Sequence, residues 1–240
     1  MAATVFALPA AAVGVLAYGY LTLPDVRPLR TTNPETTAFI ELRAREAQAH
    51  GVAVKRAMRW QPYARISRDL KRAVLVAEDD AVWQHEGVDF EQLQDSLQID
   101  WRRGRFSRGA STITQQLAKN LYLSPSRNPY RKLAELLITR RLEAELSKGR
   151  IFELYLNEIE WGDGIWGAQA AAQAYFDEPA SSLSPDQAAL LAGAIINPRL
   201  YSPAHPNQRL LRRQQIILKN MGMATPPYPP SVPLYNVPSR

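Results

Sequence analysis

The segment that decides the fold reads RGASTITQQLAKN and covers residues 108–120. Gly109 gives the backbone freedom to turn, and Ser111 or Thr112 can then cap a helix. The residues that follow predict this helix over about residues 114–123. The free N–H groups and the dipole at the start of such a helix favour a bound anion.

The predicted helix has one apolar face and one polar face. Its apolar residues recur every four positions, as expected for a face that packs on a core, and are Ile113, Leu117 and Leu121. Its polar residues lie close enough in the sequence to form a contiguous stripe of Gln115, Gln116, Lys119 and Asn120. The stripe is either the solvated face of an ordinary helix or a surface that binds a polar ligand. Its amide content and single charge are unusual for a solvated face, but the residues alone leave both interpretations open.

A carboxylate follows an apolar run upstream of this segment. Glu78 comes directly after the apolar residues 73–77 and is followed by Asp79 and Asp80. Partial desolvation of such a carboxylate raises its pKa toward that of a useful general base. The alternative is a solvated acidic cluster at a helix end, which position alone favours.

A third group of candidates combines three cations with one carboxylate: Arg127, Arg131, Lys132 and Glu135. The cations can bind phosphate, and Glu135 can serve as a second carboxylate. The alternative is a surface pair of small energetic value, because Arg131 and Glu135 lie four positions apart on a predicted helix. The three histidines show no metal-ligand spacing, so the sequence names no metal ligand.

Most of the chain has a helical hydrophobic pattern, which predicts a mainly α fold. One helix is predicted over about residues 130–148, with Gly149 placed to end it. Its predicted apolar face consists of Leu133, Leu136, Leu137 and Ile138. Another helix should begin at Ser184 with a capping box to Gln187, and should be buried along residues 188–196.

The N-terminal region divides into two parts. The first 24 residues carry no charge and reach the roughly 20 residues that cross a bilayer core, which predicts a transmembrane anchor over residues 1–24. A cleaved signal peptide is the alternative, and the positive charges after the segment weakly favour the opposite membrane orientation. Residues 25–62 are mixed and polar and predict an N-terminal linker region with a helix over residues 38–49.

The remaining chain is predicted to form a globular domain over residues 63–222 and a flexible, proline-rich tail over residues 223–240. The net charge of +6 is compatible with nucleic acid, phospholipid headgroups or phosphorylated substrates. The chain has no cysteine, which excludes disulfides and thiolate zinc sites.

Five stretches resemble, in order and spacing, the signature motifs of peptidoglycan glycosyltransferases (glycosyltransferase family 51). They are Glu78-Asp79 with residues 85–89, and then residues 109–121, 131–135, 150–172 and 183–203. The second motif is very specific, and the resemblance covers about residues 65–222. Four positions depart from the family pattern without touching either carboxylate: Val82, Ala110, Ala134 and Gln187. No penicillin-binding domain follows, so the chain resembles the monofunctional branch.

The resemblance implies a lysozyme-like globular head with a smaller membrane-facing jaw, preceded by one transmembrane helix. It implies that Glu78 acts as a catalytic base and that Glu135 is a second catalytic carboxylate, which supports the cations. The substrate-binding residues implied are Ser111, Thr112, Gln115, Gln116, Lys119, Asn120, Arg127, Arg131 and Lys132.

The implied substrate is lipid II, a disaccharide-pentapeptide on undecaprenyl pyrophosphate, which would be polymerised into glycan strands with inversion. A divalent cation, Mg²⁺ or Mn²⁺, is expected to bind through the substrate pyrophosphate. The expected partners are lipid II, the growing glycan strand, the membrane and other cell-wall synthesis or division proteins, but not nucleic acid. The expected location is the bacterial plasma membrane, with the catalytic domain on the extracytoplasmic side.

Three other functions compete with this interpretation. A lytic transglycosylase or muramidase would share the fold and a catalytic glutamate but would cleave glycan. A non-catalytic scaffold of the division machinery would tolerate replacement of Glu78. A nucleic-acid binder is disfavoured, because the basic residues are dispersed and form no known recognition module.

Overall fold

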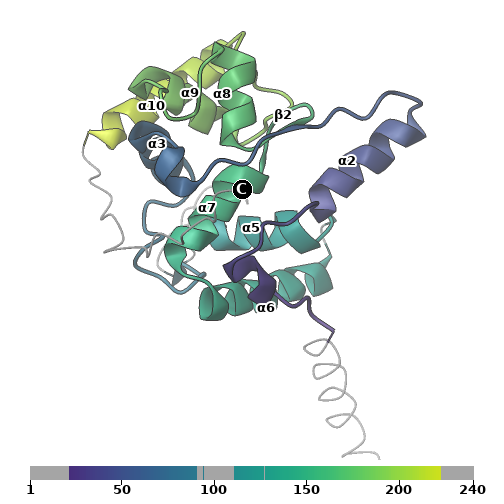
Figure 1. Cartoon of the computed structure of the whole chain (residues 1–240). Coiled ribbons are helices and arrows are strands. Elements are labelled where there is room, and N and C mark those ends of the chain that lie inside the picture. The colour runs from purple at the N-terminus through teal and green to yellow at the C-terminus, as the bar shows by residue number, and fades with distance from the viewer. Residues whose placement is uncertain (1–21, 91–93, 95–110, 127, 223–240) are drawn as a thin grey trace, which may run out of the picture.

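The structure of the protein is a computed structural model that describes residues 22–90, 94, 111–126 and 128–222. Figure 1 shows that this part of the chain is mainly helical, which confirms the prediction of a mainly α fold. Its α-helices are α2 (Ala38–Ala49), α3 (Arg68–Glu78), α5 (Ile113–Tyr122), α6 (Pro129–Glu145), α7 (Lys148–Glu158), α8 (Ala168–Phe176), α9 (Pro185–Ala194) and α10 (Gln208–Met221). Two 3-10 helices span Arg27–Arg30 and Tyr63–Arg65.

A small sheet connects the predicted N-terminal linker region to the middle of the globular domain. The strands are β1 (Ala57–Met58), β2 (Glu160–Gly162) and β3 (Ile165–Trp166), in the order β1-β3-β2. Strand β1 runs parallel to β3, and β2 runs antiparallel to it. The predicted linker region therefore contributes a strand to this sheet, and its helix α2 contacts α5.

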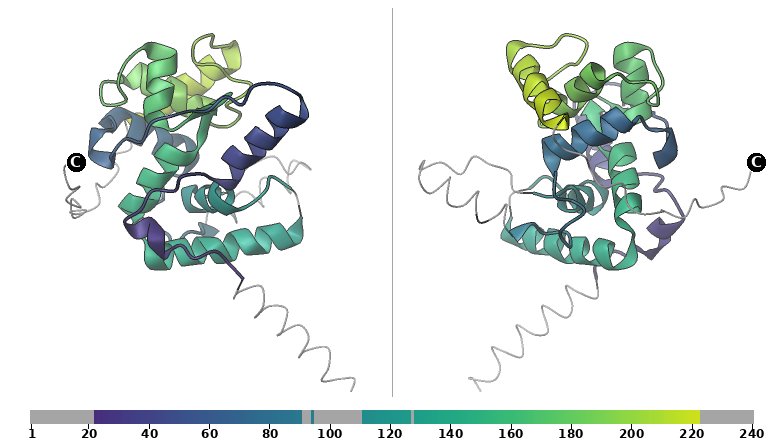
Figure 2. Two further views of the ribbon diagram at one scale, coloured as in Figure 1. Left: turned by 45° about the vertical axis from the view of Figure 1, so that its right-hand side comes forward. Right: turned by 90° about the vertical axis from the view of Figure 1, so that its left-hand side faces the viewer.

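The helices form two groups that α7 connects. Helices α3, α9 and α10 pack together at one end, while α5 packs against α6 and α7 at the other, as the two views of Figure 2 show. One continuous core joins the groups, and its largest fully buried side chains include Trp161, Tyr155 and Phe152. This arrangement brings the end of α3 close to the start of α5.

Capping explains where two of these helices begin. Thr112 caps α5 and Ser184 caps α9, each in a capping box with the glutamine three residues later. The capping box predicted at Ser184 is confirmed. The burial predicted along residues 188–196 is confirmed for residues 188–194 only, because the helix ends at Ala194 and Ile196 is 59% exposed. Helix α2 covers the predicted residues 38–49. The predicted apolar face of α5 is also confirmed, because Ile113, Leu117 and Leu121 are buried.

One prediction for the following helices was wrong, and another was right only in part. Gly149 does not end α6, which stops at Glu145, because Leu146 is extended and Ser147 caps a new helix by accepting from the Arg150 N–H. Gly149 instead lies buried in the first turn of α7. The predicted apolar face of α6 is only partly used for packing: Ile138 is buried, whereas Leu133 and Leu136 are exposed.

None of the helices in the described ranges is long and apolar enough to cross a membrane. The predicted anchor over residues 1–24 lies almost wholly outside the described residues, as does the predicted tail over residues 223–240.

Glu158, at the end of α7, is fully buried, and neither of its carboxylate oxygens has a hydrogen-bond partner among the described residues. Burial raises its pKa from the ordinary 4.5 to about 8, against the opposing charges of Arg56 and Arg150. The folded state therefore holds this proton more tightly than the unfolded state does. The resulting stabilisation is complete below about pH 4.5 and is lost as the pH rises through about 8.

We expect Glu158→Gln, which stays neutral, to reduce this loss of stability at alkaline pH. Urea unfolding at about pH 5 and about pH 9 should show a smaller decrease in unfolding free energy for the variant than for the wild type. Glu35→Gln, at an exposed position, is the control and should behave like the wild type. An equal decrease in all three proteins would contradict the assignment.

Candidate active site

Glu78 is the last residue of α3 and is half-buried at the point where α3 approaches α5. Its Oε2 accepts a hydrogen bond of 3.0 Å from Gln116 Nε2. Burial raises the pKa of Glu78, although the Gln116 hydrogen bond and the positive charges of Arg213 and Lys119 act in the opposite direction. A carboxyl group in this setting is suited to accept a proton near neutral pH.

The orientation of the Gln116 amide is fixed from its other side. The hydroxyl of Tyr155 donates to Gln116 Oε1 at 3.0 Å, so the amide nitrogen must face Glu78. Tyr155 is fully buried on α7, which holds the hydroxyl in place. No role for Tyr155 could be predicted from the sequence, because its contact with Gln116 joins two helices that are distant in the chain.

Asp79 connects the end of α3 to the start of α5. Its buried carboxylate accepts the Ile113 N–H at 2.9 Å and lies 3.0 Å from His85 Nε2. His85 Nδ1 accepts from the Gly87 N–H at 3.1 Å, so Nε2 carries the ring hydrogen and donates it to Asp79. Asp79 is thus a positioning residue that holds Glu78 and Gln116 next to each other.

The N-terminus of α5 is held by the turn that contains Gly87. The Thr112 hydroxyl donates to the Gly87 carbonyl oxygen at 2.7 Å. Gly87 has a φ of +84°, and a Cβ there would lie 2.6 Å from Thr139 Cγ2 and 2.8 Å from Glu143 Cγ on α6. Because a side chain fits neither the backbone conformation nor the space, only glycine allows this close approach.

Three of the predicted substrate-binding side chains are used within α5 itself. Thr112 and Gln115 are buried and bond each other's backbone in the capping box. Asn120 is also buried, and its Nδ2 donates to the Gln116 carbonyl oxygen. The carbonyl oxygen of Ser111 lies 3.3 Å from Gln116 Nε2. Gln116 and Lys119 are the two residues of the predicted stripe that are half-buried rather than buried.

The pKa of Lys119 is influenced by both carboxylates, Glu78 and Glu135. Burial lowers the pKa of Lys119, the charges of Arg131 and Lys132 lower it further, and those of Glu135 and Glu78 raise it. Its Nζ also lies 5.7 Å from the centre of the Phe39 ring of α2. Lys119 therefore links the surroundings of Glu78 to the charged groups of α6.

Glu135 organises the cations of α6. Only 3% of Glu135 is exposed, and its two oxygens bind different cations: Arg131 Nη1 at 2.5 Å and Lys132 Nζ. Arg131 is largely buried and Lys132 is half-exposed. The structure thus brings together Glu78, Gln116 and Lys119, with Glu135, Arg131 and Lys132 beyond them, whereas the predicted site residue Arg127 lies outside the described residues.

The site can perform two operations. A half-buried carboxyl group with a raised pKa can take a proton, and nearby cations can stabilise negative charge that develops on a phosphorylated group. Within the described ranges no three His, Asp or Glu residues gather to hold a metal ion.

Comparisons with known proteins show which protein family this sequence resembles. A family model described as "Transglycosylase" matches residues 46–222. The biosynthetic peptidoglycan transglycosylase of Laribacter hongkongensis is 50% identical over 81% of this chain and 86% of its own length. Proteins of the same name from Dechloromonas aromatica and Aromatoleum aromaticum are 46% and 49% identical, each over 81% of this chain and 84% of their own length.

We expect Gln116→Leu to raise the pKa of Glu78 further, because the variant loses the hydrogen bond that stabilises the charged carboxylate. The titration of the Glu78 carboxyl carbon, followed by ¹³C NMR in selectively labelled protein, measures this shift. Gln215→Leu, at an exposed position on α10, is the matched control. An unchanged Glu78 titration in Gln116→Leu would show that the hydrogen bond has no electrostatic effect.

Proposed function

The chain belongs to the transglycosylase family, and we propose that it polymerises lipid II into the glycan strands of peptidoglycan. Polymerisation of peptidoglycan glycan strands follows from the family match and from the shared name of its relatives. The identity of the substrate, the role of each residue and the membrane location are the parts that we propose. The observation that carries the proposal is the half-buried Glu78 with a raised pKa beside Lys119.

Glu78 acts as the general base in the proposed reaction. It removes the proton from the 4-hydroxyl of the acceptor sugar, and that oxygen attacks the anomeric carbon of the lipid-linked chain. The bond from the anomeric carbon to the pyrophosphate oxygen breaks, and the configuration inverts. The logic parallels an inverting glycosidase in which a sugar hydroxyl replaces water. The raised pKa of Glu78 makes the carboxylate basic enough for this transfer.

The cations stabilise the departing pyrophosphate. Lys119, Arg131 and Lys132 supply three positive charges, and Glu135 offsets one of them while holding two in place. The excess of positive charge suits a leaving group on which negative charge develops, so a strong general acid is not required. Arg127 would add a further cation under the same proposal.

A divalent cation, Mg²⁺ or Mn²⁺, belongs to the proposal only through the substrate. Since the described residues gather no carboxylate and histidine cluster, they fit an ion held mainly by the pyrophosphate oxygens rather than by the protein. Such an ion would neutralise charge on the leaving group.

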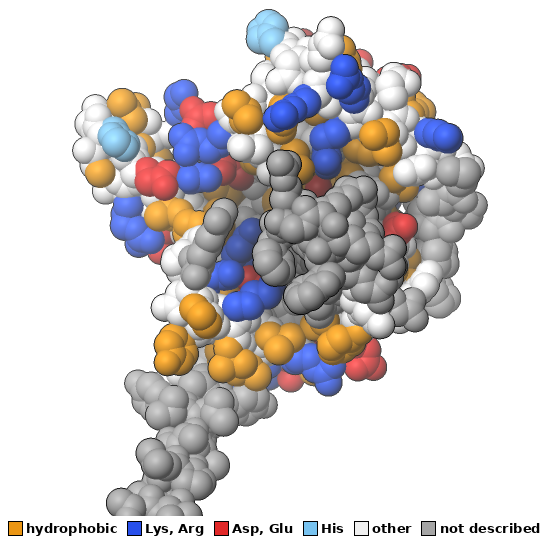
Figure 3. Space-filling model, turned by 180° about the vertical axis from the view of Figure 1, so that it is seen from behind, with side chains coloured by type: hydrophobic (Ala, Val, Ile, Leu, Met, Phe, Trp, Pro, Cys, Tyr) orange, Lys and Arg blue, Asp and Glu red, His pale blue; other side chains and the backbone are white. Residues whose placement is uncertain are grey.

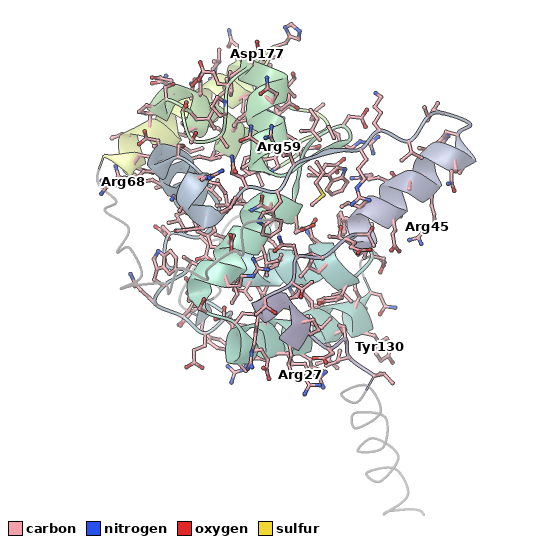
Figure 4. All side chains as sticks on the ribbon, viewed as in Figure 1. Arg27, Arg45, Arg59, Arg68, Tyr130 and Asp177 are labelled. Atoms are coloured by element: carbon pink, nitrogen blue, oxygen red, sulfur yellow. The ribbon has the colours of Figure 1, made fainter. Side chains whose placement is uncertain are left out.

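The membrane location rests on residues 1–24 and on an exposed apolar row on α6. Tyr130, Leu133 and Leu136 share one side of α6 and are 79%, 43% and 37% exposed. In Figure 4 Tyr130 points outward from the edge of the molecule, and Figure 3 shows apolar side chains along this edge. Arg141, also on α6, donates to the carbonyl oxygen of Leu23, so the chain enters the domain beside this helix.

We propose that this edge faces the outer surface of the plasma membrane, with residues 1–24 as a single-pass anchor. The lipid tail of the substrate would then stay in the bilayer while its sugars reach Glu78. The division into a lysozyme-like head and a membrane-facing jaw belongs to the same proposal. Other cell-wall synthesis or division proteins are proposed partners at this surface.

We expect Glu78→Gln to lower polymerisation about 10²–10⁴-fold, since the amide keeps the shape of the side chain but cannot accept the proton. The assay is incubation of the purified full chain with labelled lipid II and a divalent cation, followed by sizing of the glycan strands. Circular dichroism should show unchanged helix content. Glu86→Gln, at an exposed carboxylate of the first motif, is the matched control.

Retained turnover in Glu78→Gln would remove Glu78 as the base. Release of small sugar products from finished strands by the wild-type chain, without growth of strands from lipid II, would show a glycan-cleaving enzyme instead.

The absence of native cysteine allows a direct test of the membrane-facing edge. Environment-sensitive dyes attached to Leu133→Cys and Leu136→Cys should be quenched by lipid-borne quenchers in proteoliposomes, because these positions would contact the bilayer. A dye on Ile216→Cys, an apolar position on α10 that is 61% exposed, is the control and should not be quenched. Equal quenching at all three positions, or none on α6, would contradict the proposed orientation.

A further inference from the structure

One cleft of the described structure contains none of the residues assigned to the candidate active site. It lies between α2, the turn that joins β2 to β3, and the segment after α9, and has a volume of about 620 Å³. Figure 3 shows acidic and basic side chains side by side on the part of the molecule that carries α2. The charged residues that line the cleft are Arg43, Glu46, Lys55, Glu160, Asp163 and Arg199.

The charges of this cleft are balanced. Among its described lining residues, three cations face three carboxylates, so the cleft has no net preference for an anion or a cation. At the rim, Lys55 Nζ binds Asp163 Oδ2 at 2.9 Å, and both side chains are more than half-exposed. A ligand that carries both signs of charge would match this lining better than a ligand that carries one.

Glu160 provides an unused acceptor in the wall of the cleft, on an oxygen that neighbouring groups cover, so a ligand must displace part of this wall to reach it. Its side chain is 6% exposed, and its Oε2 accepts from Arg43 Nε at 3.0 Å and from Arg43 Nη2 at 2.9 Å. Its Oε1 is buried and has no hydrogen-bond partner among the described residues. A buried carboxylate oxygen without a donor is costly, and an additional donor would remove that cost.

Arg43 does not supply this donor in the structure, because its bonds go to Glu160 Oε2 and, from Nη1 at 2.9 Å, to Glu46 Oε2. An ammonium group from a ligand is the kind of donor that Glu160 Oε1 lacks. Ammonium carries three donors and a positive charge, and its bond to a carboxylate is stronger than a bond from a neutral group.

Arg199 offers the complementary group. Its guanidinium lies 3.5 Å from Glu46 and 3.6 Å from Asp163, which exceeds the usual length of an N–H···O hydrogen bond. Its side chain is 47% exposed, so the guanidinium can turn toward a ligand. Glu46 Oε2 approaches both Arg43 and Arg199, which places the two guanidinium groups around the same cleft as Glu160. A guanidinium group binds a carboxylate with two parallel hydrogen bonds.

We propose that this cleft binds an amino-acid head group, with the ammonium on Glu160 Oε1 and the carboxylate on Arg199. The head group is either a free amino acid or, if the proposed function holds, the end of a side chain in the peptide of the substrate. In the second case the cleft would bind the peptide of the substrate, while the candidate active site would act on its sugar.

The first experiment measures binding of small probes to the full chain by calorimetry. The probe is 2,6-diaminopimelate, which has an amino-acid head group at each end. Pimelate lacks its amino groups, and 1,5-diaminopentane lacks its carboxylates. We expect diaminopimelate to bind at least tenfold more tightly than either, and Arg199→Gln and Glu160→Gln to lose that preference. Arg45→Gln, a side chain on α2 that points away from the molecule in Figure 4, is the matched control and should retain it.

The second experiment compares two lipid II substrates whose peptides carry diaminopimelate or lysine at the same position. Lysine keeps the ammonium but lacks the neighbouring carboxylate. If the cleft binds the peptide of the substrate, KM should be at least threefold lower for the diaminopimelate form than for the lysine form. Arg199→Gln should abolish this difference in KM. The same variant should leave kcat for the lysine form unchanged. Binding of the free probe without such a difference would identify a free amino acid as the ligand.

Three results would overturn the proposal. The first is equal binding of pimelate and diaminopimelate, and the second is a preference that persists in Arg199→Gln. The third is failure to bind the free probe together with equal KM values for both substrates. The calorimetric measurement needs no catalysis, and Glu78→Gln should bind the probe like the wild type. Failure of the cleft proposal is therefore distinguishable from failure of the proposed function.

Discussion

The carboxylate of Asp79 is the constraint on which the candidate site depends. It receives the first backbone N–H of α5 and the ring N–H of His85, so it ties two separate segments to the end of α3. The first bond is buried and the second is partly buried, and Asp79 itself is buried, where an unpaired carboxylate would be strongly unfavourable. If the segments moved apart, the Asp79 carboxylate would lose its hydrogen bonds or become exposed to solvent. The neighbouring Glu78 therefore stays beside Gln116.

Local features of the sequence were sufficient to predict several helices. The capping box at Ser184 and the burial of the residues that follow it depend only on neighbours in the chain. The same is true of the core-facing positions of α5, which a repeat of apolar residues reveals. The sequence also contained the second motif and the two carboxylates, which the structure places on α3 and α6 around α5.

Features that depend on packing between distant segments could not be predicted in this way. Leu133 and Leu136 have the spacing of a core face, yet the side of α6 that packs inward is centred on Ile138 and Leu142. Tyr155 reads as one more apolar residue of α7, and only the packing of α7 on α5 shows that its hydroxyl orients an amide. The sequence also could not show which residues of the polar stripe on α5 cap the helix and which are half-buried, because this depends on the packing of α5 in the fold.

The fixed Gln116 amide makes the two oxygens of the Glu78 carboxyl group unequal, because it donates a hydrogen bond to only one of them. Because the Tyr155 hydroxyl occupies the amide oxygen, an N–H always points at Glu78 Oε2. One lone pair of Oε2 is therefore engaged by Gln116, which favours Oε1 as the oxygen that would take a proton if Glu78 acts as the proposed base. The difference between the two oxygens of Glu78 is thus set from a distance, by the buried hydroxyl of Tyr155 on α7.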